Sequence, residues 1–208
     1  MAYLLFDLDG TLVNSSTGIK NAFYHSFTEL GLTHPNDKTL STFIGPPLET
    51  TFAHYFDNKE AITHAISIFR DYYETQGVYQ AKLYQDIPET LEALSQEHRL
   101  FVTTSKHQPM AHKMLSDLDI DKYFTAIYGS LPERYLKTDV IKVCLNNHHI
   151  PHDEAAIIGD TRFDMIGGRE TNITCVGVTW GFGSADDLKK SGADTLIHHP
   201  KELLSLSI

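Results

Sequence analysis

Short apolar runs bounded by turn residues recur along the chain, and stretches with helical spacing separate them. The runs have the length of strands and lack polar alternation, which is typical of parallel strands covered on both faces. They cover residues 3–6, 100–104, 126–128, 155–158 and 174–178. Apolar residues three and four apart predict helices around 88–94, 110–118 and 140–145. This alternation predicts an α/β fold, a doubly wound parallel sheet with a Rossmann-like core and right-handed crossovers.

One segment lacks this alternation of strands and helices, because no strand pattern occurs between the first apolar run and Pro88. Helical stripes occupy 19–30, 52–56 and 62–73, and Gly45-Pro46-Pro47 lies between the first two. We therefore predict a small α-helical cap domain at residues 14–79, inserted into a core domain formed by 1–13 and 80–208. The expected hinges are 14–18 and 77–82.

Composition and charge narrow the classes of partner. The chain has 208 residues, 41% of them hydrophobic and 21% charged, which suits one globular domain with a smaller insert. A net charge of −10 argues against a nucleic-acid polymer or an anionic membrane as partner. A small anionic substrate remains possible if the site supplies positive charge locally.

Several features favour a cytoplasmic protein. The apolar runs are too short to cross a bilayer, and no basic stretch precedes the first of them, as a secretory signal would require. Cys144 and Cys175 lack the spacing of a metal or redox motif, so buried free thiols in a reducing compartment are expected. We expect a monomer or a weak homodimer.

Charged and hydroxyl side chains follow the predicted strands, at the edge where parallel sheets bind ligands. Asp7 and Asp9 follow the first strand and precede Gly10. Further candidates follow the later strands: Thr103, Thr104, Ser105, Lys137, Asp160 and Asp164. We expect these side chains to converge on one site.

Clustered carboxylates repel one another unless a cation lies between them. Mg²⁺ suits a few carboxylate oxygens and retains positions for water or substrate. Asp7, Asp160 and Asp9, the last through its backbone carbonyl, are the candidate ligands. The metal would also allow an acidic protein to bind phosphate.

The other groups fit phosphoryl transfer. The Lys137 ammonium suits phosphate oxygens. The Thr104 hydroxyl and the loop at Ser105 can donate further hydrogen bonds, with Thr103 as an alternative to Thr104. Asp7 can attack phosphorus and form an aspartyl-phosphate. Asp9 can protonate the leaving oxygen and later activate water.

The motifs together resemble those of the haloacid dehalogenase superfamily. They are DLDGTL at 7–12, TTSK at 103–106, Lys137 within LKTDVI, and GDTRFD at 159–164. The phosphoglycolate phosphatase-like branch, which carries a helical cap after the first strand, is the most similar. The resemblance implies the roles given above and makes Asp164 a carboxylate that supports the metal ligands. It also places IGPPLE at 44–49 against the leaving group of the substrate.

The resulting hypothesis is a Mg²⁺-dependent phosphatase that hydrolyses a small phosphate monoester through an aspartyl-phosphate. The resemblance makes 2-phosphoglycolate the first candidate substrate, with nucleoside monophosphates and pyrophosphate as alternatives. A phosphosugar mutase would share every core residue. A non-catalytic phosphate-binding protein is a third possibility, which the complete set of acidic and basic residues disfavours.

Other readings of the motifs fail on spacing. An EF-hand would require glycine at Leu12 and glutamate at Gly18. No GxxxxGK[ST] motif is present, and the GFG at 181–183 lacks the spacing of a dinucleotide-binding loop. The paired histidines 148–149 and 198–199 are expected on the surface.

Overall fold

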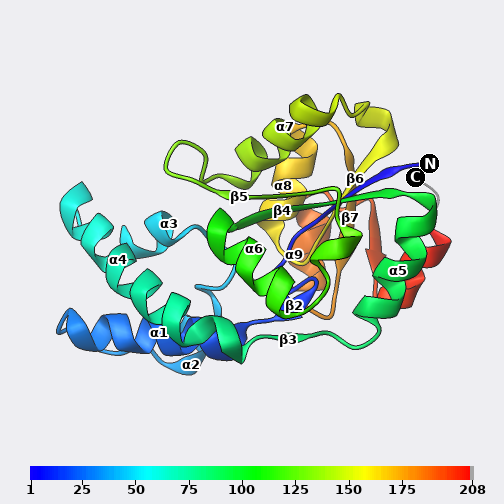
Figure 1. The fold of residues 1–208 in the computed structure, drawn as a ribbon. Coiled ribbons are helices and arrows are strands. Elements are labelled where there is room, and N and C mark those ends of the chain that lie inside the picture. The colour runs from blue at the N-terminus through cyan, green and yellow to red at the C-terminus, as the bar shows by residue number, and fades with distance from the viewer. Residues whose placement is uncertain (207–208) are drawn as a thin grey trace.

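A six-stranded parallel sheet forms the centre of the protein, in a computed structural model that describes residues 1–206 (Figure 1). The strand order is β5-β4-β1-β6-β7-β8. The bounds are β1 (Tyr3–Phe6), β4 (Arg99–His107), β5 (Ala126–Ser130), β6 (Ala155–Gly159), β7 (Thr174–Val178) and β8 (Thr195–Ile197). The predicted fold class is confirmed, and all five predicted strands are present. The sequence pattern missed β8, a three-residue strand at the edge of the sheet.

Helices cover both faces of this sheet, which explains why its strands are apolar without alternation. On one face Leu5 and Ile157 pack with Ile141 of α7 (Lys137–His148), Met165 of α8 (Arg162–Glu170) and Leu188 of α9 (Ala185–Lys190). On the other face α5 (Ile87–Glu97) and α6 (Gln108–Asp117) contribute to the second core. Short 3₁₀ helices complete the described chain: η1 (Gly77–Gln80), η2 (Asp121–Tyr123), η3 (His152–Glu154) and η4 (Pro200–Ser205).

The central strand β1 determines where the site forms. It pairs in parallel with β4 on one side and with β6 on the other. Leu5 and Phe6 have no exposed surface. The carboxyl ends of β1, β4 and β6 therefore point to the same edge of the sheet.

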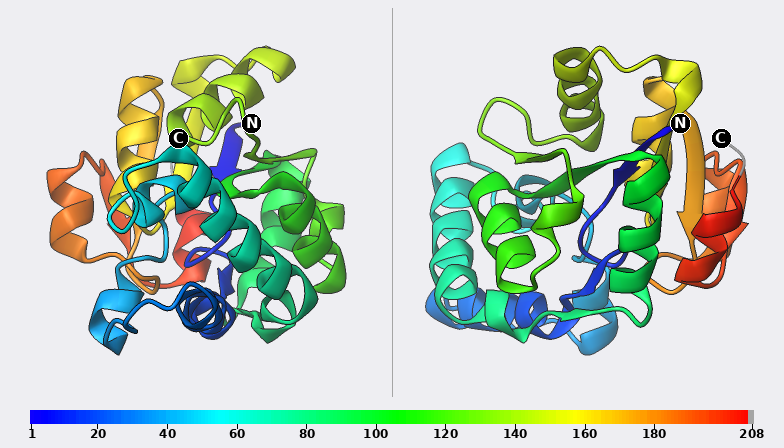
Figure 2. Two further views of the ribbon diagram at one scale, coloured as in Figure 1. Left: turned by 90° about the vertical axis from the view of Figure 1, so that its left-hand side faces the viewer. Right: turned by 45° about the vertical axis from the view of Figure 1, so that its right-hand side comes forward.

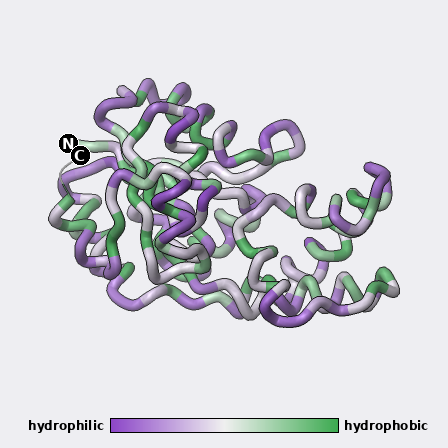
Figure 3. The backbone as a smooth tube through the Cα atoms, turned by 180° about the vertical axis from the view of Figure 1, so that it is seen from behind, coloured by the Kyte–Doolittle hydropathy of each residue, from purple (hydrophilic) through white to green (hydrophobic). Residues whose placement is uncertain are grey.

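Four helices extend beyond that edge and form a separate layer (Figures 1 and 2). They are α1 (Ser16–Glu29), α2 (Asp37–Ser41), α3 (Leu48–Phe52) and α4 (Lys59–Thr75). Phe23 of α1 has no exposed surface, and its ring packs against those of Phe43, Phe52 and Phe69. Hydrophobic and hydrophilic residues alternate along these helices, which agrees with helices that bury one face (Figure 3).

The helical layer differs in detail from the sequence prediction. The expected helix through Phe52 and Phe56 ends at Phe52. Helix α2 was not predicted, because a helix of five residues is too short to show a periodic pattern of apolar residues. Two short antiparallel strands, β2 (Val13–Asn14) and β3 (Lys82–Leu83), pair where the chain leaves the core and returns to it. The domain boundaries at 14–79 and 80–208 stay predictions, and residues 207–208 lie outside the described chain.

Within residues 1–206, no helix combines the length and apolar character that crossing a membrane would require. The two cysteines, Cys144 and Cys175, are buried free thiols, as expected.

Close packing of α8 on the sheet gives a prediction for stability. A Cβ at Gly168 would lie 2.5 Å from the sulfur of Cys175 and 2.6 Å from Cγ2 of Ile157. Gly168→Val should therefore lower the free energy of unfolding by about 2–3 kcal/mol, measured by urea denaturation. The control is Ile166→Val at an exposed position of the same helix, with an effect below about 0.5 kcal/mol. Equal effects of the two variants would contradict this account of the packing.

Candidate active site

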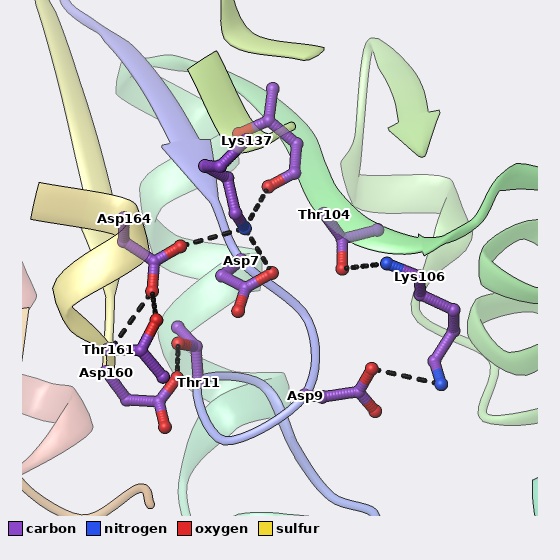
Figure 4. Close-up of polar contacts among 10 residues, drawn as sticks. Asp7, Asp9, Thr11, Thr104, Lys106, Lys137, Asp160, Thr161 and Asp164 are labelled. Carbon is purple, nitrogen blue, oxygen red and sulfur yellow. Dashed lines mark hydrogen bonds and ion pairs between the residues drawn. The ribbon is translucent and has the colours of Figure 1, made fainter. Parts of the chain in front are cut away.

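Three carboxylates from separate elements meet at the carboxyl edge of the sheet (Figure 4). Asp7 follows β1, Asp160 follows β6, and Asp164 lies in the first turn of α8. Each is buried, and each offers one oxygen that lies within 4.8 Å of the others. The structure thus brings together the two predicted carboxylate ligands, and it adds Asp164, which was expected only to support them.

A single lysine lies against this cluster. Lys137 is the first residue of α7 and is 5% exposed. Its ammonium is 2.6 Å from Oδ1 of Asp7 and 2.8 Å from Oδ1 of Asp164, and it donates to the carbonyl of Thr103 at 2.9 Å. Its ammonium thus lies beside two of the three carboxyl groups of the cluster.

Two hydrogen bonds and the close approach of two loops hold the Asp160 side chain in place. Its Oδ1 accepts from the Thr11 hydroxyl at 3.2 Å, and its Oδ2 accepts from the backbone N–H of Phe182 at 2.7 Å. Gly10, at φ +88°, and Gly181 pass so close that a Cβ would lie 2.1 Å and 2.3 Å from the nearest Asp160 atom. Glycine is therefore required at both positions for the loops to surround this carboxylate.

Asp164 has two functions within the fold. Its Oδ2 accepts from the backbone N–H of Thr161 at 3.0 Å and from the Thr161 hydroxyl at 2.8 Å, closing a capping box on α8. Its Oδ1 faces Lys137. The cap therefore fixes the carboxylate beside the cluster.

Burial and mutual repulsion raise the pKa values of Asp7 and Asp160. Burial raises the pKa of Asp7 to about 6 from its ordinary 3.8, although Lys137 acts in the opposite direction. Burial also raises the pKa of Asp160 well above 3.8, with added repulsion from Asp164 and Asp7. A divalent cation among these oxygens would offset both effects, and an all-oxygen donor set is what Mg²⁺ prefers. The residues present thus fit a magnesium ion.

The carboxylate of Asp9 turns away from the cluster. Its Oδ1 accepts from the Ser15 hydroxyl, and its Oδ2 forms an ion pair with Lys106 at 3.0 Å. Asp9 is therefore not part of the carboxylate cluster through its side chain, and metal binding through its backbone carbonyl stays a prediction. Sequence reasoning missed Lys106, although it lies within the TTSK motif that was recognised.

The neighbouring threonines differ in where their hydroxyls lie. Thr104 and Ser105 line a cavity beside Asp7, and the Thr104 hydroxyl accepts from the backbone N–H of Lys106 at 3.2 Å. The Thr103 hydroxyl is buried away from this cavity and has no hydrogen-bond partner among residues 1–206. This placement favours Thr104 as the phosphate-binding residue.

The cavity, of about 90 Å³, lies between the helical layer and the carboxyl edge of the sheet. Asp7 and Asp9 lie at its core side, and residues from the IGPPLE segment at 44–49, which ends in the first turn of α3, line it as well. Apolar side chains dominate the helical side: Ile19, Phe23, Phe43, Ile44, Leu48 and Phe69. Charged groups also line it: Glu49, Arg70, Glu74 and Lys106. The cavity therefore offers both apolar surface and charge to a leaving group.

The pattern of the haloacid dehalogenase-like hydrolases matches residues 4–178 of the chain. The chain belongs to this family. A haloacid dehalogenase-like family hydrolase from Streptococcus pneumoniae is 45% identical, with a TM-score of 0.92 over 99% of this chain and 97% of that one. A "5'-nucleotidase" from Pseudomonas aeruginosa is 35% identical over 89% of this chain and 86% of its own. A "Phosphoglycolate phosphatase" from Photorhabdus laumondii is 24% identical over 97% and 90%.

These comparisons confirm the family predicted from the motifs and the prediction of a phosphoric monoester hydrolase. The activities of the relatives differ, so family membership alone leaves the substrate open.

The raised pKa of Asp7 predicts a pH effect on the protein in chelator. Between pH 3.8 and about 6, the folded protein keeps a proton on Asp7 that the unfolded chain has released. The stabilisation by this proton is therefore complete below 3.8 and is lost as the pH rises through about 6. Asparagine cannot titrate, so Asp7→Asn should gain about 2 kcal/mol relative to wild type between about pH 4.5 and about pH 7.5. Urea denaturation in EDTA measures this difference, and a difference that stays constant with pH would contradict the burial argument.

Proposed function

We propose that the protein is a Mg²⁺-dependent phosphatase that hydrolyses a small phosphate monoester through an aspartyl-phosphate on Asp7. The observation that carries this proposal is the buried cluster of Asp7, Asp160 and Asp164, with Lys137 forming ion pairs with Asp7 and Asp164. Such a cluster is costly unless cations neutralise it, and one of its members, Asp7, lines the cavity. A metal and a phosphoryl group together would complete it.

The proposed reaction has two steps. In the first, a carboxylate oxygen of Asp7 attacks phosphorus, the ester P–O bond breaks, and Asp9 gives its proton to the leaving alkoxide oxygen. In the second, Asp9 takes a proton from water as the water oxygen attacks the phosphorus of the aspartyl-phosphate. The bond between phosphorus and Asp7 then breaks, which regenerates the carboxylate and releases inorganic phosphate.

Two kinds of positive charge would support this chemistry. Lys137 contacts the proposed nucleophile and can bind a phosphate oxygen, while the Thr104 hydroxyl and the loop at Ser105 can donate to others. Asp7, Asp160 and the backbone carbonyl of Asp9 would hold Mg²⁺, with Asp164 beside them. When bound, the ion supplies charge neutralisation for the phosphoryl group.

The helical layer would close the cavity over the substrate. Its apolar side chains would contact the leaving group and exclude water from the cavity. Exclusion of water would protect the aspartyl-phosphate from untimely hydrolysis. Domain boundaries at residues 14–79, with hinges near 14–18 and 77–82, are part of this proposal.

Two substrate classes are worth testing first. The motif resemblance makes 2-phosphoglycolate one candidate, for which Arg70 at the cavity could face the carboxylate. The aromatic side chain of Phe43 in the lining favours a leaving group that carries a planar ring instead. A nucleoside monophosphate supplies such a ring in its base, and the 35% identical relative bears the name 5'-nucleotidase. Pyrophosphate remains a third candidate.

We further propose a cytoplasmic enzyme that acts as a monomer or a weak homodimer. The buried free thiols of Cys144 and Cys175 suit a reducing compartment. The net charge of −10 argues against nucleic acid or an anionic membrane as partner, and it leaves a small phosphorylated metabolite possible because Lys137 and the metal would supply positive charge locally.

A phosphate-release screen tests the proposed activity. The wild type should release phosphate from at least one compound in a panel of phosphoglycolate, nucleoside monophosphates, sugar phosphates and the anhydride pyrophosphate. Asp7→Asn keeps the shape of the side chain but removes the nucleophile, so activity should fall by about 10³-fold or more. Residual activity above about a hundredth of wild type would rule out Asp7 as nucleophile. Release from no ester would favour a non-catalytic phosphate-binding protein.

Metal removal tests the proposed cofactor. EDTA should abolish phosphate release, and added Mg²⁺ should restore it. Asp160→Asn should raise the Mg²⁺ concentration needed for half-maximal activity and for thermal stabilisation by about tenfold or more. Asp153→Asn, which removes an exposed carboxylate, is the matched control. Full activity in EDTA, or an unchanged Mg²⁺ requirement in Asp160→Asn, would remove the metal site from the account.

A phosphosugar mutase is distinguished by the fate of the phosphoryl group. Incubation with a bisphosphorylated sugar should release free phosphate if the enzyme is a phosphatase. Positional transfer between sugar hydroxyls without free phosphate would assign the mutase reaction instead.

A further inference from the structure

The carboxylate of Asp9 is held by two donors from different parts of the molecule. The Ser15 hydroxyl, just before α1, donates to Oδ1. The ammonium of Lys106, at the end of β4, lies 3.0 Å from Oδ2. The side chains of Asp9 and Lys106 are only 13% and 7% exposed. Asp9 is thus fixed in an orientation that faces the cavity and not the carboxylate cluster (Figure 4).

Lys106 is itself held by the helical layer. Its ammonium donates to the hydroxyl of Tyr73 in α4 at 2.9 Å and lies 4.3 Å from the centre of that ring. Its backbone N–H donates to the Thr104 hydroxyl at 3.2 Å. One residue therefore contacts the helical layer, the proposed acid and base, and the proposed phosphate-binding hydroxyl.

Tyr73 has little freedom to adjust. It is 3% exposed and stacks on Phe69 with ring centres 5.8 Å apart. Gly77 lies so close that a Cβ there would be 2.6 Å from the Tyr73 ring. A movement of α4 relative to the sheet would therefore move the hydroxyl that holds Lys106.

We propose that Lys106 is a positioning residue that, anchored by Tyr73 of α4, holds Asp9 facing the leaving group when the helical layer is closed. This inference rests on the proposed function, in which Asp9 protonates the leaving oxygen. Besides phosphate binding through Thr104, the TTSK motif would then couple closure of the helical layer to proton transfer, through Lys106. Proton transfer is then efficient only while α4 lies in place, because movement of α4 away from the sheet removes the Tyr73 hydroxyl that anchors Lys106 beside Asp9.

The leaving group gives a readout that a purely structural ion pair would not change. An alkoxide needs a proton as it leaves, whereas 4-nitrophenolate is stable enough to leave without one. The value of kcat/KM reports the steps up to departure of the leaving group and does not depend on hydrolysis of the aspartyl-phosphate. Comparing kcat/KM for 4-nitrophenyl phosphate and for the best alkyl ester of the screen therefore isolates proton donation.

Lys106→Met should lower kcat/KM for the alkyl ester by about 10²-fold, and for 4-nitrophenyl phosphate by less than about fivefold. Tyr73→Phe removes one oxygen atom and should lower the alkyl value alone, by about three- to tenfold. Lys106→Arg keeps the charge and should recover part of the loss.

The matched control is Lys113→Met, because Lys113 has similar contacts but does not line the cavity. Its ammonium lies 2.9 Å from Asp117 and 4.7 Å from the centre of the Tyr79 ring. This variant should leave both values unchanged.

A double variant completes the test. If Lys106 acts through Asp9, then Lys106→Met should add no further loss on the alkyl ester in an Asp9→Asn background. Equal losses on the two esters, or additive losses in the double variant, would overturn the inference while leaving the proposed phosphatase intact. A wild type that cleaves neither ester would overturn the proposed function and this inference with it. Should Lys106→Met fail to fold, Tyr73→Phe decides by the same comparison of esters.

Discussion

An imbalance of buried charge at the carboxyl end of β1 is the constraint on which the rest of the site depends. Three carboxylates, Asp7, Asp160 and Asp164, share this position with the single ammonium of Lys137. Burial penalises each charge, and the raised pKa of Asp7 expresses that penalty. Proteins retain such clusters of charge where a bound cation or substrate compensates them, so the imbalance indicates a functional site at this edge of the sheet.

The fold supplies these groups from rigid elements. Parallel pairing of β1 with β4 and β6 brings three strand ends to one edge of the sheet. The first turns of α7 and α8 add Lys137 and Asp164. A lysine at the start of a helix opposes the helix dipole, and the two carboxylates that it contacts offset this effect. Contacts with the two carboxylates, and not the stability of helix α7, thus explain why a lysine occupies this position.

Much of this arrangement follows from the sequence because it depends on local patterns. Continuous apolar runs predicted the buried parallel strands, and their order along the chain placed Asp7 and Asp160 at one edge. Short elements such as α2 and β8 gave too little periodicity to be recognised.

The orientation of side chains was not predictable in the same way. The turn of Asp9 away from the cluster depends on Lys106, which is held by a tyrosine 33 residues earlier in a different layer. No local pattern encodes such a contact. The choice between Thr103 and Thr104 likewise depends on which face of β4 each side chain occupies, and on a strand end that the sequence left ambiguous.

Mass spectrometry of acid-quenched enzyme can detect whether Asp7 becomes phosphorylated during turnover. Enzyme mixed with a substrate ester and Mg²⁺ would be quenched in acid within the first turnover and digested. If Asp7 is the nucleophile, the peptide that contains it should carry one phosphoryl group, labile to hydroxylamine and missing from an Asp7→Asn sample. Rapid phosphate release with no phosphoryl group on that peptide at any quench time, or with the group on another residue, would contradict this role of Asp7.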